Sequence, residues 1–118
     1  MTNENISYNR LSDEDMQKAY KLFFGTFVSN SRLMIINLLR EKRRNVSEIV
    51  QKLKTDQSSV SHDLTRLKNC GFVKAKAEGA YRYYELNTET IKPLMKIIDK
   101  HMSAHCLHII QANKGGKR

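Results

Sequence analysis

The sequence predicts a mainly α-helical fold with one β-hairpin, in the chain order of four helices, the hairpin and a final helix. Three observations favour this fold class. Apolar residues recur at spacings of three and four over most of the chain, which is the periodicity of amphipathic helices. Residues 72–77 and 80–86 instead alternate in character on either side of Glu78-Gly79, as the strands of a hairpin do. Apolar residues make up 40% of the 118, enough for the core of a single domain over residues 1–118.

The first expected helix follows Ser12, whose side chain is a good N-cap. Asp13, Glu14 and Asp15 then lie where acidic side chains meet the positive end of a helix dipole. The apolar face that follows is broad, and its members are Met16, Ala19, Tyr20, Phe23, Phe24 and Phe27. Together with the final helix, this face exceeds what a monomer of this size can easily bury, so it indicates a dimer.

Three shorter helices are expected next. Residues 29–32 interrupt the first pattern and supply a cap for a second helix, which ends at the basic cluster of residues 42–44. Ser47 is expected to cap the third helix and Asp56 the fourth. Their apolar positions are Leu33, Ile36 and Leu39 in the second helix, Val46, Ile49, Val50 and Leu53 in the third, and Val60, Leu64 and Leu67 in the fourth.

The remaining elements are the hairpin and one long helix. Gly71 falls just past the fourth helix, where a left-handed residue is favoured. The final helix is expected to run from about residue 88 to about residue 112. Its apolar stripe consists of Ile91, Leu94, Ile98, Met102 and Ile109. We expect flexible tails at residues 1–11 and 113–118.

The charge of the chain points to a polyanion as partner. The formal net charge is +9, and it is unevenly distributed: residues 1–31 carry −1, residues 32–86 carry +6 and residues 87–118 carry +4. A basic surplus in the middle and at the end of a chain is typical of nucleic-acid binding. Charge alone is equally compatible with a solvated surface, so a motif has to decide between the two.

Cysteine content and hydropathy bear on location. Two cysteines, Cys70 and Cys106, cannot form a multi-disulfide framework, and we expect Cys70 to be an inert small side chain. No apolar run approaches the roughly 18 residues of a membrane span. The first ten residues lack the apolar segment of a signal peptide. These features predict a cytoplasmic protein with no membrane partner.

A short helix, a tight turn, a second helix and a two-stranded ribbon form the plan of a winged helix-turn-helix. In that plan the second helix enters the major groove of double-stranded DNA. Serines are poor interior helix formers, yet Ser58, Ser59 and Ser61 occupy the first turns of the fourth helix, which suits a helix that contacts base edges. Gln57 can pair with adenine, and His62 can reach a base or a phosphate. The cations expected around this helix are Lys54, Arg66, Lys68, Lys74, Lys76 and Arg82.

The chain resembles the ArsR/SmtB family of small winged-helix repressors over roughly residues 15–110. The matching segments are "SNSRLMIINLL", "VSEIVQKL" and "DQSSVSHDLTRLKNCGFVKAKAEGAYRYYEL". The resemblance implies a homodimer formed through the first and last helices, from which a metal ion, an oxidant or another signal releases DNA. It also implies which residues face DNA: Gln57, Ser58, Ser59, Ser61 and His62 on the helix, with Lys76 and Arg82 on the wing.

The resemblance does not supply a complete sensor site. The stretch that matches the family's thiolate metal site, "NVSEIV", contains no cysteine. At a second family site, Thr88 and Thr90 occupy the two early positions and only His101 aligns with a later one. The stretch "DKHMSAHCLH" offers different ligands for a divalent metal such as zinc, completed by the partner subunit: His101, His105, Cys106 and His108. Packing or surface roles are the alternative for these residues.

The leading hypothesis is therefore a homodimeric repressor that binds an inverted-repeat operator and is released by a small signal. One alternative is a constitutive or architectural DNA-binding protein without a ligand. Another is a winged helix that binds proteins, which an acid such as Asp63 on the reading face would favour. An enzyme finds no support, because the sequence has no phosphate-binding glycine loop, paired carboxylates or nucleophile with an evident base.

Overall fold

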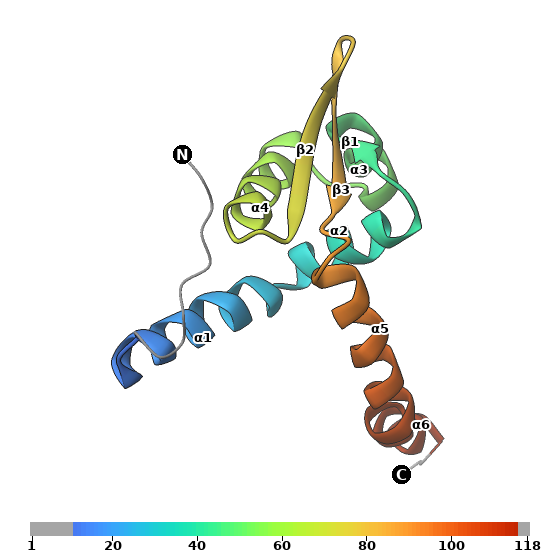
Figure 1. Cartoon of the computed structure of the whole chain (residues 1–118). Helices are drawn as coiled ribbons and strands as arrows, with labels where there is room; N and C mark the ends of the chain where they lie inside the picture. Colours follow the sequence, from blue (N-terminus) through green and yellow to red (C-terminus); the bar gives the residue numbers. More distant parts are fainter. Residues whose placement is uncertain (1–10, 116–118) are drawn as a thin grey trace.

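A computed structural model describes residues 11–115 and shows a helical body, a small sheet and two helical arms that project from the body (Figure 1). The elements are α1 (Asp13–Phe27), α2 (Asn30–Glu41), β1 (Arg44–Asn45), α3 (Val46–Leu53), α4 (Gln57–Asn69), β2 (Val73–Glu78), β3 (Tyr81–Leu86), α5 (Ile91–His101), a π-helical turn (Met102–Cys106) and α6 (Leu107–Gly115). The expected class, mainly α-helical with a hairpin wing, is confirmed.

The sheet has three antiparallel strands in the order β1-β3-β2. The hairpin pairs Val73 with Leu86 at its base and Glu78 with Tyr81 at its tip. The strand β1, at Arg44–Asn45, pairs with the outer edge of β3. β1 is not predictable from the sequence, because two residues are too few for an alternating pattern to be recognised.

The hydrophobic core lies where α2, α3 and α4 pack against the base of the hairpin. Its buried members are Ile35, Ile36, Leu39, Ile49, Val60, Leu64, Leu67, Phe72, Val73, Leu86, Ile91 and Met95. Phe72 is fully buried, and its ring centroid lies 5.2 Å from those of both Phe23 and Phe27. These aromatic contacts attach the end of α1 to the body of the molecule.

The predicted N-caps Ser12 and Asp56 are confirmed, and within residues 29–32 the cap of the second helix is Ser29. Ser12, Ser29 and Asp56 each accept a hydrogen bond from the backbone N–H three residues further on. The prediction for the third helix is wrong, because its cap is Asn45 rather than Ser47. Asn45 and Glu48 form a capping box in which each side chain accepts the other's backbone N–H, both at 2.9 Å.

The predicted start and end of the last helix also need correction. The helix begins at Ile91, not near Thr88, because the Asn87 side chain accepts the backbone N–H groups of Glu89 and Thr90 and holds them in a turn. The helix does not end near Ala112 but continues to Gly115.

The π-helical turn at Met102–Cys106 divides this C-terminal arm. A π-turn inserts one extra residue per turn, so the face presented by α6 is rotated relative to a continuous α-helix. The expected tail at 113–118 is wrong for residues 113–115, which are helical. Residues 1–10 and 116–118 of the expected tails lie outside the described residues.

Within residues 11–115 no single helix has the length and hydrophobicity to cross a membrane. The helices α1 and α2 reach those values only when taken together, as a pair bent by 73°.

Replacing Asn45 with Ala is expected to lower the free energy of unfolding by about 1 kcal/mol, because the capping box is lost. Ser47 is exposed and lies two residues away, so Ser47→Ala is the matched control and is expected to stay within about 0.5 kcal/mol. Denaturant unfolding at one fixed protein concentration measures both. Equal effects of the two substitutions would contradict the assigned cap.

Candidate nucleic-acid interface

The helix α4 has two chemically distinct faces. Val60, Asp63, Leu64 and Leu67 are buried against the body. The exposed side carries five of the predicted contact residues: Gln57, Ser58, Ser59, His62 and Arg66. Ser61 is half-buried and lies at the edge of this face. We call the exposed set Gln57, Ser58, Ser59, His62 and Arg66 the reading face.

The first turn of α4 fixes the chemistry of Ser59. Asp56 accepts hydrogen bonds from the Ser59 backbone N–H at 2.8 Å and from the Ser59 hydroxyl at 2.9 Å. These hydrogen bonds lower the pKa of Asp56, which is therefore ionised at neutral pH. Because the hydroxyl proton of Ser59 points to Asp56, Ser59 offers outward only acceptor lone pairs. Such an oxygen suits an amino group on the edge of adenine or cytosine.

The hairpin separates the predicted wing cations. Successive residues of a strand point to opposite faces, so Lys74 and Lys76 lie on one face of the hairpin. Arg82 pairs with Ala77 and lies on the other face. Glu85 stands directly opposite Lys74 and reduces the positive potential there. The wing therefore does not gather its three cations into one patch.

Arg43, in the loop before β1, binds the wing through its side chain. Its guanidinium donates two hydrogen bonds to Glu78, at 2.6 and 2.9 Å, and lies 4.4 Å from the ring centroid of Tyr83. The bonds to Arg43 lower the pKa of Glu78, so the carboxylate is ionised at neutral pH. The sequence places Arg43 only within the basic cluster of residues 42–44, and the structure shows that it links this loop to the wing.

A second cationic surface lies on the outer side of α3. It is a hollow of about 620 Å³ lined by Lys42, Arg44, Glu48, Gln51 and Lys52. Arg44 is buried and donates to Glu41 at 2.8 Å, while its Nε has no hydrogen-bond partner among the described residues. Within the basic cluster at residues 42–44, Arg43 and Arg44 each form an ion pair with a glutamate. Among the described residues, Lys42 is the one member of the cluster that is exposed and forms no ion pair.

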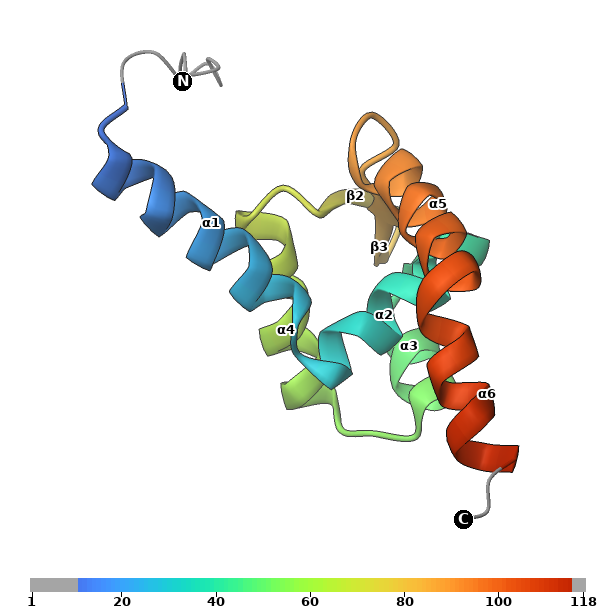
Figure 2. The ribbon, with the colours of Figure 1, turned by 90° about the horizontal axis from the view of Figure 1, so that it is seen from below.

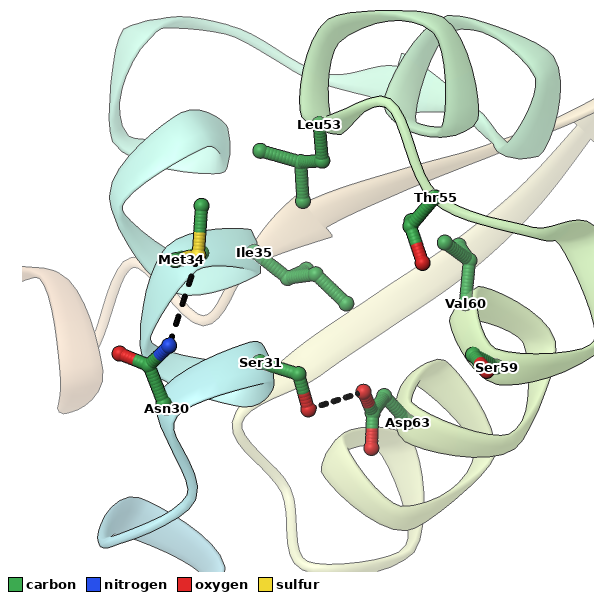
Figure 3. A pocket seen from close by; sticks show the side chains of 9 residues that line it. All are labelled: Asn30, Ser31, Met34, Ile35, Leu53, Thr55, Ser59, Val60 and Asp63. Atoms are coloured by element: carbon green, nitrogen blue, oxygen red, sulfur yellow. Dashed lines mark hydrogen bonds between the residues drawn. The ribbon is translucent and has the colours of Figure 1, made fainter.

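Asp63 does not block the reading face. Its side chain points into the body, where it accepts a hydrogen bond from the Ser31 hydroxyl at 2.7 Å (Figure 3). Arg32 donates to the second carboxylate oxygen at 3.3 Å. The sequence feature that favoured a protein-binding module is therefore absent from the exposed side of α4. Sequence reasoning missed this pair because its partners are 31 residues apart.

An apolar surface lies between the two arms of the molecule. The arms α1 and α5–α6 diverge from the body with α2 between them (Figure 2). A cavity of about 730 Å³ opens there, lined by Phe23, Phe24, Phe27, Val28, Leu33, Asn37, Leu94, Met95, Ile98, Asp99 and Met102. Phe24 is 59% exposed, which is a large apolar area to leave in water. This surface coincides with the predicted dimer helices.

The predicted metal ligands lie on the C-terminal arm. His101 and His105 have ring centroids 4.7 Å apart, and Cys106 and His108 are exposed beyond them. Within the described residues of one chain, no group of three or more His, Cys, Asp or Glu side chains is placed to hold a metal ion. Asp99 is held by Arg40 through two hydrogen bonds, which lower the pKa of the carboxyl group.

A helix-turn-helix with an exposed polar reading face, followed by a hairpin, defines a winged helix-turn-helix regulator. Residues 29–75 match the model of the bacterial regulatory protein, arsR family. The chain is 36% identical over 88 residues to the uncharacterized HTH-type transcriptional regulator MJ1325 of Methanocaldococcus jannaschii, covering 74% of this chain and 98% of that protein. The chain belongs to the ArsR family of transcriptional regulators.

Two further proteins extend the comparison. Transcriptional repressor PagR of Bacillus anthracis is 32% identical over 75 residues, covering 63% of this chain and 75% of PagR. The homodimeric winged helix-turn-helix DNA-binding domain of Mb0332 from Mycobacterium bovis superposes with a TM-score of 0.74 at 25% identity, covering 84% of this chain and 94% of that one.

Replacing Glu78 with Gln is expected to raise duplex affinity several-fold, because it removes an anion from the wing and releases the Arg43 guanidinium for phosphate. The slope of log affinity against log salt should become more negative by about one. Fluorescence anisotropy at several salt concentrations measures both quantities. Glu14→Gln makes the same charge change on exposed α1 and should leave the slope unaltered. A slope unaffected by Glu78→Gln would contradict the role assigned to the ion pair.

Proposed function

We propose that this protein is a cytoplasmic homodimeric repressor that binds an inverted-repeat operator in double-stranded DNA and has no enzymatic activity. The observation that carries the proposal is the division of α4 into a buried edge and an exposed polar face. A two-fold axis between subunits presents two such faces to major grooves about one helical turn apart, or a multiple of it. The homodimeric Mb0332 domain supports dimerisation, and the apolar surface between α1 and α5 supplies the contact.

The proposal assigns separate roles to the predicted contact residues. The residues proposed to contact base edges are Gln57, Ser58, Ser59 and His62. Ser61 lies beside them at the edge of the reading face. Arg66 with the wing cations Lys74, Lys76 and Arg82 contacts phosphates. Base contacts then set sequence preference, while the cations set affinity and its dependence on salt.

Gln57→Ala and His62→Ala are each expected to weaken operator binding by about 5- to 150-fold, the equivalent of about 1–3 kcal/mol for a lost base contact. Gel shifts on DNA from upstream of the protein's own gene, against a shuffled duplex, provide the measurement. Gln17→Ala on α1 is the matched control, because it removes the same side chain from an exposed position outside the reading face and outside the cationic hollow on α3. Operator affinity equal to that of the control would overturn the assignment.

We further propose that a divalent metal such as zinc binds the C-terminal arm and lowers operator affinity. The close approach of the His101 and His105 rings supports this, because two imidazoles one helical turn apart can share one ion. Two ligands are too few for a stable site, so side chains contributed by the partner subunit, Cys106 or His108 among them, complete it. A constitutive DNA-binding protein, which needs no such site, is the alternative.

Zinc is expected to reduce operator affinity at least tenfold, or about 1.4 kcal/mol of coupling between the two sites. The His101→Ala/His105→Ala double variant should bind the operator normally and lose the response to zinc. Anisotropy titrations with zinc and with excess chelator measure this coupling. Operator affinity that is the same with zinc and with chelator in the unmodified protein favours the constitutive alternative.

A further inference from the structure

We propose that Arg32, Ser31 and Asp63 position the reading helix and thereby set the preference for operator over other DNA; this rests on the proposed function. None of the three belongs to the reading face. All three act through α4, so they are positioning residues rather than contacts.

The geometry of Arg32 joins three helices at one guanidinium. Its Nη1 donates to Asp63 on α4 at 3.3 Å. Its Nε and Nη2 donate to the backbone carbonyls of Thr26 and Gly25, at 2.8 and 3.0 Å. Those carbonyls lie in the last turn of α1, where backbone acceptors lack helical partners. Arg32 itself lies at the start of α2, so one side chain fixes α4 relative to α1 and α2.

Burial makes this connection strong. The Arg32 and Asp63 side chains retain only 13% and 9% of their exposure to solvent. Water therefore screens the pair weakly, and removal of either partner leaves a buried charge without compensation. The Ser31 hydroxyl donates to the other carboxylate oxygen at 2.7 Å, so both oxygens of Asp63 are engaged by α2.

Packing alone does not fix this part of α4. A hollow of about 130 Å³ lies between the start of α2 and the first turns of α4, and Figure 3 shows its lining. Ser59 and Val60 line it from α4, and Met34 lines it from α2. A gap of this size removes apolar contacts that would otherwise hold the helix against rotation. The two hydrogen-bonded oxygens of Asp63 therefore orient the turns that carry Ser59 and His62.

The test compares a variant's affinity for operator with its affinity for a random duplex. Asp63→Asn is expected to weaken operator binding about tenfold while random-duplex affinity stays within about twofold, because no phosphate contact is lost. Arg32→Lys retains the positive charge but loses the planar guanidinium whose three nitrogens donate to Asp63, Thr26 and Gly25. It should therefore also weaken operator binding more than random-duplex binding. In the double variant the two losses should not add, because both break the same connection.

Two variants separate positioning from general destabilisation. Ile91→Val lowers stability through the core without touching α4's polar contacts, and should leave the operator preference unchanged. Ser31→Ala removes a single hydroxyl from an exposed residue, so it provides the test if Asp63→Asn does not fold. It should reduce the ratio of operator affinity to random-duplex affinity about threefold.

The outcomes distinguish the two proposals. If the unmodified protein binds operator and random duplex equally, the proposed function fails. The positioning role is wrong if the unmodified protein prefers its operator and the Asp63→Asn variant keeps the same preference. Ser31→Ala takes the place of Asp63→Asn in this comparison if Asp63→Asn does not fold. Equal losses on both duplexes would also overturn it, since they indicate damage to the fold.

Discussion

The structure depends on the burial of one edge of α4. Val60, Leu64 and Leu67 are at most 1% exposed, and their spacing selects the rotation of the helix that turns this edge toward the body, a rotation that the contacts of Asp63 then hold in its first turns. The same rotation determines which residues face outward, so core packing and the reading face are set together. The helices α2 and α3 provide the surface against which that edge packs.

Much of this arrangement follows from local sequence patterns. The periodicity of α4 gave both its buried edge and its exposed serines, and Asp56 and Gly71 marked its ends through their side-chain and backbone chemistry. The N-cap of α3 was misplaced because Asn45 and Ser47 are both good caps, and only the reciprocal bond to Glu48 distinguishes them. Such competition between neighbouring caps is decided by geometry rather than by composition.

The long-range polar pairs could not be predicted in this way. Arg40 and Asp99 are 59 residues apart, and Arg43 and Glu78 are 35 apart, so no local spacing identifies either pair. Counting the charges of the wing region therefore overstated the cations available to DNA. The π-helical turn could not be predicted from a periodicity of about 100° per residue either. It changes the face of the last helix on which the histidines after His101 lie.

The helix α2 connects the two functional regions of the subunit through its own arginines. At one end Arg32 binds α1 and α4, and at the other Arg40 binds Asp99 on α5. The apolar surface between α1 and α5 is therefore framed by the same helix that orients α4. Side chains packed at native density move as units rather than deforming continuously. The reading helix and the apolar surface between α1 and α5 are therefore attached to the same packed helix, α2.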